Sequence, residues 1–184
     1  MTNIAVHLAN GFEEIEAITI IDVLRRAKLN VTTISISDNR NVVGSHQIPV
    51  MADKLFTEVD YSTIDVIVLP GGRTGAENLD QHEGLRNQII QFHHDKKLLG
   101  AICAAPLVFG HLNILKGEKA VCYPGFESEL HGAEILELPT VRSGNVITGR
   151  GAGVAMKFAL KLIEELISKQ KADDLAKAMV VEGA

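Results

Sequence analysis

Short, mostly apolar segments alternate along this chain with longer helix-like segments, and this alternation limits the possible folds more than any other feature. The clearest apolar segments are Asn3–Leu8, Val31–Ser37, Asp65–Leu69 and Leu98–Ile102. A strand that is apolar on both faces has to be covered on both faces, and in parallel sheets the crossover helices provide that cover. The pattern therefore predicts an α/β protein with a doubly wound, mostly parallel sheet and helices on both faces.

The rest of the chain is expected to supply the helices and remaining strands of one domain, residues 1–184. No repeat, low-complexity tract or Ser/Pro-rich linker divides the 184 residues, a length that suits a single domain. Pro49 interrupts Ser45–Asp53 and favours irregular or hairpin structure there. We expect helices at Glu13–Leu29, Glu83–Asp95, Gly153–Ile167, Ala172–Val181 and directly after Cys103, and strands at Val121–Tyr123, Ile135–Leu138 and Val146–Thr148.

Charge, hydropathy and cysteine content exclude several function classes. The formal net charge of −5 gives no basis for binding nucleic acid or acidic lipid. No apolar stretch approaches the ~18 residues of a membrane span, and no basic, apolar leader follows Met1. Two cysteines are too few for a disulfide framework, and a reducing compartment is the default. We therefore expect a cytoplasmic protein that binds neither membranes nor specific nucleic-acid sequences.

The segment from Leu98 to Pro106 places a cysteine in a sharp strand-to-helix turn. An apolar strand runs into a helix without a polar loop, and small residues surround Cys103. A nucleophile elbow needs small neighbours, because the backbones of its strand and helix come close together. A thiol at a helix start is favoured as thiolate by the free N–H groups. Cys103 is either such a nucleophile or a buried core cysteine, whereas Cys122 ends an ordinary strand and is interpreted as core.

Glu16 lies on the apolar face of the helix that begins near Glu13. At ~100° per residue, its neighbours on the helix include Ile20 and Val23. Burial raises the pKa of a carboxyl group and favours its protonated form, which could donate a hydrogen bond to a thiolate or move a proton in catalysis. The alternative is a glutamate held by backbone groups at the helix start, where Glu13 and Glu14 complement the helix dipole.

Two glycine-rich loops follow predicted strands. In Pro70-Gly71-Gly72, glycines let backbone N–H groups approach a ligand, as an oxyanion hole requires, and a simple turn is the alternative. Gly149–Gly153 looks superficially like a dinucleotide loop, but Val154 occupies the last glycine position of that fingerprint, so nucleotide binding is rejected. His93 and His94 have no partner ligands at recognisable spacing, so no metal site is expected.

Four motifs occur in a fixed order over almost the whole chain. They are Gly11-Phe12-Glu13-Glu14-Ile15-Glu16, Asp65-Val66-Ile67-Val68-Leu69-Pro70-Gly71-Gly72, Ala101-Ile102-Cys103-Ala104-Ala105-Pro106, and Arg150-Gly151-Ala152-Gly153 with Phe158-Ala159-Leu160. Together they resemble the ThiJ/PfpI superfamily, in the branch of the Parkinson-disease protein DJ-1. The last motif is similar to the Arg-Gly-Pro-Gly of that branch, with Ala152 in place of the proline.

The resemblance implies a flavodoxin-like fold, a homodimer, and a reactive, easily oxidised cysteine at Cys103 with Glu16 as its protonated partner. It places backbone N–H donors at Gly72 and Ala104. The implied activities use no cofactor: they are glutathione-independent glyoxalase activity, deglycation of methylglyoxal-modified proteins and nucleotides, and protection against oxidative stress, including chaperone behaviour. The implied partners are a small aldehyde or a glycated protein or nucleotide, and a second copy of the chain.

The pocket is expected to include Gly71, Tyr123, Arg150 and His46. Tyr123 stands where many members of the family have a histidine, and a tyrosine with a pKa of ~10 mainly donates a hydrogen bond. This departure affects the turnover rate more than the reaction class. His46 stands where the branch has an arginine contributed across the dimer interface.

These residues predict attack of the Cys103 thiolate on the aldehyde carbon of a small α-oxoaldehyde or its amine adduct, with proton transfer by Glu16. One alternative is a redox sensor or chaperone whose Cys103 is oxidised without turnover. Another is an amidotransferase- or protease-like hydrolase of the same superfamily. That hydrolase is disfavoured, because no histidine directly follows the cysteine.

Overall fold

A sheet of seven strands forms the centre of the computed structural model, which describes residues 2–182. Its strand order is β10-β11-β7-β6-β1-β2-β5, and all neighbours are parallel except β10 and β11. The strands of this sheet are β1 (Asn3–Leu8), β2 (Asn30–Ser35), β5 (Lys54–Leu55), β6 (Val66–Leu69), β7 (Leu98–Ile102), β10 (Thr140–Ser143) and β11 (Val146–Gly149). Two small sheets pair β3 (Asn41–Val43) with β4 (Pro49–Met51) and β8 (Lys119–Ala120) with β9 (Glu134–Ile135).

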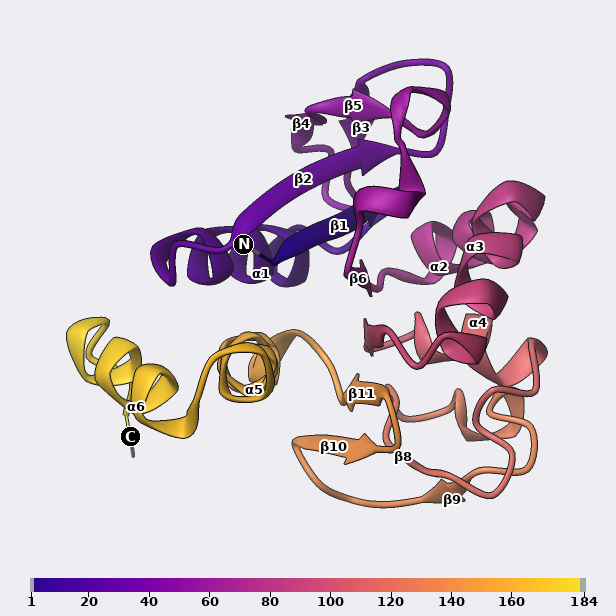
Figure 1. The fold of residues 1–184 in the computed structure, drawn as a ribbon. Helices are drawn as coiled ribbons and strands as arrows, with labels where there is room; N and C mark the ends of the chain where they lie inside the picture. Colours follow the sequence, from indigo (N-terminus) through magenta and orange to yellow (C-terminus); the bar gives the residue numbers. More distant parts are fainter. Residues whose placement is uncertain (1, 183–184) are drawn as a thin grey trace.

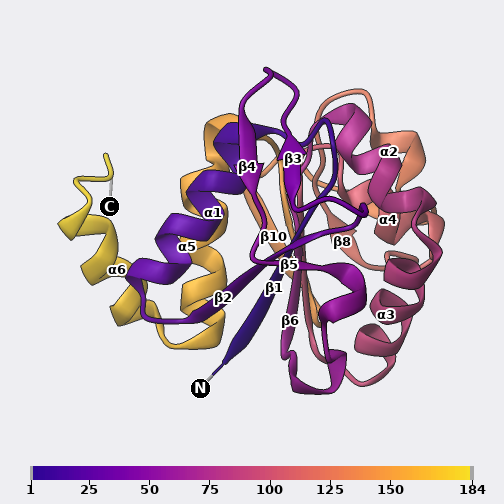
Figure 2. The same ribbon diagram turned by 90° about the horizontal axis from the view of Figure 1, so that it is seen from above.

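Helices cover both faces of the large sheet, which confirms the predicted doubly wound α/β class (Figure 1). Figure 2 shows α1 and α5 on one face, with α6 outside them, and α2, α3 and α4 on the other. The α-helices are α1 (Glu14–Arg26), α2 (Arg73–Gln81), α3 (Glu83–His94), α4 (Pro106–His111), α5 (Ala155–Leu166) and α6 (Lys169–Ala178). Short 3-10 turns lie at Phe56–Glu58, Tyr61–Thr63, Glu127–Glu129 and Ala152–Val154.

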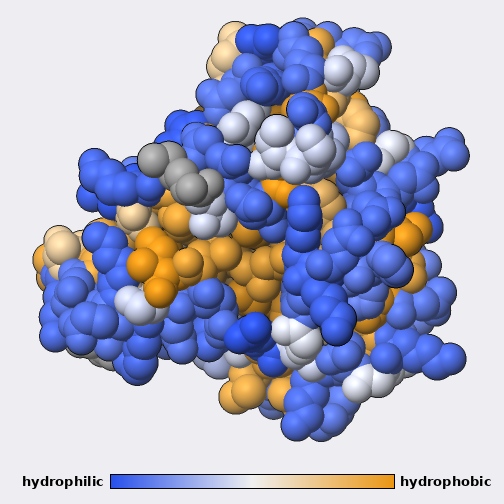
Figure 3. All heavy atoms as spheres, in the orientation of Figure 1, coloured by the Kyte–Doolittle hydropathy of each residue, from blue (hydrophilic) through white to orange (hydrophobic). Residues whose placement is uncertain are grey.

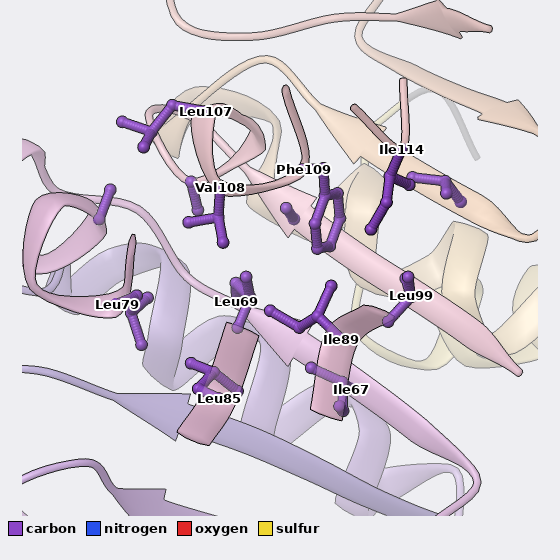
Figure 4. Packing of buried hydrophobic residues seen from close by; sticks show 14 of the residues in the cluster. Ile67, Leu69, Leu79, Leu85, Ile89, Leu99, Leu107, Val108, Phe109 and Ile114 are labelled. Carbon is purple, nitrogen blue, oxygen red and sulfur yellow. The ribbon is translucent and has the colours of Figure 1, made fainter. Parts of the chain in front are cut away.

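Each face of the sheet has its own hydrophobic core. Figure 4 shows one of them, in which Leu69 of β6 and Leu99 of β7 lie among Ile89 of α3 and Phe109 of α4. The other core lies beneath α1 and α5 and includes Phe158. Fully burying such side chains stabilises the fold by about 1.5–3 kcal/mol each, so the strands are held from both sides.

Several boundaries differ from the sequence predictions. The helix α2 was not predicted, because only Gly75, Ala76 and Leu79 of its nine residues are buried and its apolar pattern is correspondingly weak. The edge strand β10 was missed as well, since polar residues dominate it. The strand predicted at Val121–Tyr123 is wrong: β8 ends at Ala120, and the N–H of Val121 donates to the hydroxyl of Thr148 instead of a strand. The strand predicted at Ile135–Leu138 is shorter and displaced, at β9.

The topology gathers three loops at one edge of the sheet. The strands β2 and β5 lie on one side of β1, and β6, β7, β11 and β10 lie on the other. The order in which the chain adds strands to the sheet therefore reverses between β1 and β6. Ligands of open α/β sheets bind at the carboxyl ends of strands beside such a switch. The loop after β1, the Pro70-Gly71-Gly72 loop after β6 and Cys103 after β7 all meet there.

The surface is largely polar in the view of Figure 3, with an apolar area between α1 and the α5–α6 pair. Leu29, Leu166 and Met179 are among the partly buried residues that pack against the core under α1 and α5. Of the helices within residues 2–182, none has both the length and the hydropathy needed to cross a membrane.

Candidate active site

Cys103 occupies a strained turn directly after β7. Its backbone is left-handed, with φ at 65°, a conformation that non-glycine residues rarely adopt. The turn is held on two sides, because the N–H of Cys103 donates to the carbonyl of Gly149 (2.9 Å) and its carbonyl accepts from the N–H of Tyr123 (2.8 Å). The predicted sharp turn is therefore present, and it presents a half-buried thiol at the carboxyl edge of the sheet.

The helix start lies further from the thiol than the sequence suggests. The helix α4 begins at Pro106, three residues after Cys103, and has only six residues. Pro106 occupies its first turn, as predicted. The stabilisation of a thiolate therefore falls to individual N–H groups of the turn and not to a long helix that begins at Cys103.

The glycine loop after β6 packs too tightly against the site for a side chain. A Cβ at Gly71 would lie 2.6 Å from the Cβ of Cys103 and 2.7 Å from Oε2 of Glu16. Gly72 has φ at 86°, and a Cβ there would lie 2.3 Å from the carbonyl oxygen of Gly11. Only glycines allow this backbone to approach the thiol and the carboxyl group so closely.

Glu16 is fully buried, and its carboxyl group faces the glycine loop. Oε2 accepts a hydrogen bond from the N–H of Gly71 (2.8 Å), whereas Oε1 is buried without a partner of good hydrogen-bond geometry among the described residues. Burial raises the pKa of Glu16 to about 7 against the hydrogen bonds from Cys103 and Gly71, which lower it. The carboxyl group therefore changes protonation state near neutral pH, as an acid–base catalyst must.

The thiol and the carboxyl group form one coupled titrating pair. Burial and then the negative charge of Glu16 raise the pKa of the Cys103 thiol, while the N–H groups of Gly72 and Ala104 bond to the sulfur and lower it. Two anions in one buried site repel each other, so one proton stays on the pair over a wide pH range. The thiolate forms readily only when that proton sits on Glu16.

A cavity of about 390 Å³ opens over this pair. Five of the predicted site residues line it: Glu16, Gly72, Cys103, Ala104 and Tyr123. The remaining lining residues were not predicted and are Glu13, Ser45, Arg73, Phe126 and Ala152. Glu13 and Ala152 lie within recognised motifs and Arg73 directly follows one, so position along the sequence was an available signal. Nothing local marked Ser45 or Phe126, which the fold brings in from separate loops.

Three predicted pocket residues do not line the cavity. Gly71 is buried behind it, between the thiol and Glu16. Arg150 is half-buried, and its N–H donates to the carbonyl of Pro139 (3.0 Å). The ring of His46 is 69% exposed and bonds to Glu14. A role for His46 across a dimer interface stays a prediction.

Glu14 holds the β3–β4 hairpin against the start of α1. Its buried carboxylate accepts hydrogen bonds from the N–H of His46 (2.6 Å), the hydroxyl of Ser45 (3.0 Å) and the His46 ring (2.9 Å). Burial alone would raise the pKa of Glu14, but these bonds lower it to about 2. The simple helix-dipole role expected for Glu14 is therefore incomplete, because the residue also fastens a loop that carries the cavity residue Ser45.

Cys122 is buried and lies outside the cavity lining. Burial raises the pKa of its thiol to about 11. It follows β8 instead of ending a strand, but the interpretation of Cys122 as a core residue is confirmed.

Comparison with known proteins finds one family that covers most of the chain. Residues 2–165 match the DJ-1/PfpI family. Protein DJ-1 homolog B of Arabidopsis thaliana is 41% identical over 179 residues, which are 97% of this chain but 41% of the plant protein. The chain thus spans less than half the length of the two plant relatives that it matches.

Two further relatives align over almost their full lengths. Glutathione-independent glyoxalase DJ-1 of Schizosaccharomyces pombe is 27% identical and aligns with 97% of this chain and 98% of its own. The structure of oxidized Toxoplasma gondii DJ-1 superimposes with a TM-score of 0.95 at 37% identity, covering 99% of this chain and 100% of the other. This likeness confirms the predicted fold.

Proposed function

The chain belongs to the DJ-1/PfpI family, and we propose that it is a cysteine-dependent, cofactor-free enzyme that acts on α-oxoaldehydes or their adducts, as a glutathione-independent glyoxalase or a deglycase. One observation carries the proposal: the strained Cys103 and the buried Glu16, whose pKa is about 7, open into one cavity. The name of the Schizosaccharomyces pombe relative, a glutathione-independent glyoxalase, supports the reaction class.

The first step is addition of the thiolate to the aldehyde. The sulfur of Cys103 forms a bond to the aldehyde carbon, and the carbonyl electron pair moves to the oxygen. The N–H groups of Gly72 and Ala104, which lower the pKa of the thiol in the free protein, are the donors that would stabilise the charge on this oxygen. Protonated Glu16 then delivers its proton to the oxygen and yields a hemithioacetal.

The second step is an internal redox rearrangement. The Glu16 carboxylate removes the proton from the former aldehyde carbon and passes it to the ketone oxygen, which gives an enediol. The hydroxyl group on the former aldehyde carbon then gives its proton to Glu16, which delivers it to the former ketone carbon, and the product is the thioester of a 2-hydroxy acid. Water breaks the carbon–sulfur bond and releases the 2-hydroxy acid and the thiol, so the net reaction is addition of one water. This balance requires no external oxidant or reductant, and the chain's own groups suffice.

An adduct of the same aldehyde with an amine would follow the same route. The carbon–nitrogen bond of the adduct breaks first: the hydroxyl group on this carbon loses its proton, the amine leaves with a proton, and the free aldehyde forms again. The thiolate then adds to this aldehyde, and the rearrangement yields the same thioester. Protection of proteins or nucleotides against carbonyl stress is the cellular role that this activity would have, in the cytoplasm.

The test is consumption of methylglyoxal and formation of lactate by the purified protein. We expect Cys103→Ser to abolish turnover and Cys122→Ser to retain most of it, because only the first thiol reaches the cavity. Equal loss in both variants, each still folded, would refute the assignment.

A redox-sensing role is the second candidate, and the half-buried thiol favours it. A sulfur oxidised to sulfinate would find hydrogen-bond donors at Gly72 and Ala104. The Toxoplasma gondii relative was itself solved as an oxidized protein. Oxidation of Cys103 by mild peroxide without any turnover of methylglyoxal would favour a redox-sensing or chaperone role over catalysis.

A further inference from the structure

We propose that Arg73 is a substrate-recognition residue that selects α-oxoaldehydes, or their adducts, that carry a carboxylate group at the end remote from the aldehyde. The inference rests on the proposed function, because it assigns the substrate class of the same cavity. Arg73 lines this cavity together with Cys103, so one ligand can contact both.

No carboxylate of the described residues pairs with the charge of Arg73. Five other arginines pair with carboxylates: Arg25, Arg26, Arg40, Arg86 and Arg142. Arg73 forms no ion pair and no side-chain hydrogen bond with any residue of the range 2–182, and its side chain is exposed at the rim of the cavity. A guanidinium group presents five N–H donors, and here they remain available to a ligand.

The position of Arg73 is unfavourable for the helix that carries it. It is the first residue of α2, and the first turn of this helix has no acidic residue. A cation at a helix N-terminus is repelled by the helix dipole, which favours anions there. The dipole and the guanidinium group therefore both attract an anion at the same place.

The guanidinium group of Arg73 lies over the ring of Phe126. The guanidinium carbon Cζ of Arg73 lies 4.9 Å from the centre of the Phe126 ring, and Phe126 also lines the cavity. Stacking on an aromatic face leaves the N–H edge of the guanidinium group free, and this edge matches a carboxylate with two parallel hydrogen bonds.

The surface around Arg73 has room for a ligand larger than methylglyoxal. Arg73 also lines a hollow of about 240 Å³ beside His111 and one of about 400 Å³ beside Gly11. Glu13, a partly buried carboxylate that also lines the cavity, accepts hydrogen bonds from the N–H of Ile15 (3.4 Å) and the hydroxyl of Ser45 (3.3 Å). The site therefore presents a positive group at its mouth and a nucleophile at its base.

The first experiment measures charge selection without any turnover. In a Cys122→Ser background, iodoacetate and iodoacetamide each alkylate Cys103, and the two reagents differ in charge. Any change in thiol pKa affects both rate constants, so their ratio isolates the attraction for the anion. We expect Arg73→Gln to lower the iodoacetate-to-iodoacetamide ratio about fivefold, since one unit charge near the thiol is removed. Arg73→Lys should retain most of the ratio.

Lys177→Gln is the matched control, because it removes one positive charge from the exposed surface of α6. Its ratio should equal that of the parent protein. An Arg73→Gln ratio equal to that of Lys177→Gln would overturn the proposal.

The second experiment uses two substrates of equal length, 4,5-dioxopentanoate and 2-oxopentanal, which differ by a carboxylate in place of a methyl group. We expect Arg73→Gln to raise KM for the carboxylate substrate relative to the methyl substrate, with a smaller effect on kcat. Turnover without this preference would overturn the recognition role and leave the proposed function standing. Turnover of neither substrate, with the alkylation ratio still dependent on Arg73, would refute the proposed function and leave an anion-selective thiol site.

Discussion

Glu16 should make the folded protein less stable as pH rises, and Glu16→Gln should remove this dependence. Burial raises the pKa of Glu16 from 4.5 to about 7, so the folded state binds the proton more tightly than the unfolded state. The stabilisation is complete below pH 4.5 and is lost as pH rises through 7. At about 1.4 kcal/mol per pKa unit, the loss amounts to about 3 kcal/mol of unfolding free energy.

Two other buried groups act in the opposite direction and have to be separated from this effect. Glu14, with a pKa of about 2, contributes stability that is present above pH 4.5 and lost as pH falls through 2. His7 is fully buried, and burial lowers its pKa from 6.5 to about 3, so its contribution is present above 6.5 and lost toward 3. The window of His7 overlaps that of Glu16 and partly hides it in the wild-type protein alone.

The assay is therefore a difference measurement. Urea unfolding of wild type and Glu16→Gln at several values between pH 4 and 9 gives two curves in which His7 and Glu14 contribute equally. A Cys103→Ser background in both proteins removes the coupled thiol. The wild-type free energy of unfolding should fall by about 3 kcal/mol relative to Glu16→Gln across this range. Parallel curves would mean that Glu16 titrates normally and cannot be the acid of the proposed mechanism.

Two further predictions concern the glycine loop and assembly. Gly71→Ala should reduce thiol alkylation and turnover at least tenfold, because its Cβ would lie 2.6 Å from the Cβ of Cys103. Gly153→Ala is the control and should keep both activities, because an added Cβ there meets nothing within 4 Å. Equal activity of the two variants would contradict the packing argument. Ile15 and Ile18 are 59% and 46% exposed on α1, so we expect a homodimer through this face. Ile18→Glu should shift sedimentation toward the 19.9 kDa monomer, while Ile90→Glu on α3 should not. A wild-type protein that is already monomeric at micromolar concentration would rule the interface out.

The large elements were predictable because burial on both faces leaves a strong local pattern. The strands β1, β6 and β7 consist almost entirely of buried residues, and their apolar runs mark them directly. The helix α2 was not predictable in this way, since its buried positions are small residues and one leucine. The strand expected at Val121 failed because the N–H of Val121 donates to the side-chain hydroxyl of Thr148, and no local pattern reveals such a partner.

The site residues likewise differ in whether a local sequence pattern marks them. Cys103 was identifiable because the small residues that a tight turn requires are its neighbours in the sequence, and Glu16 because it interrupts an apolar helix face. Ser45 and Phe126 reach the cavity from loops whose positions depend on tertiary contacts, so no neighbouring residue signals them. Arg73 lies one residue beyond a recognised motif, but the absence of an ion pair at this residue is visible only in the folded structure, where five other arginines are paired.

Glu14 and Glu16 show why residue type and spacing do not fix a chemical role. Both carboxyl groups are buried on the first turns of α1, two residues apart, yet the pKa is lowered to about 2 in Glu14 and raised to about 7 in Glu16. The difference follows from the donors around each: His46 and Ser45 surround the Glu14 carboxylate, whereas Glu16 accepts one backbone N–H and leaves an oxygen without a well-placed partner. Glu14 is therefore an anion at neutral pH that fastens the hairpin, and Glu16 is the group that we propose exchanges a proton with substrate.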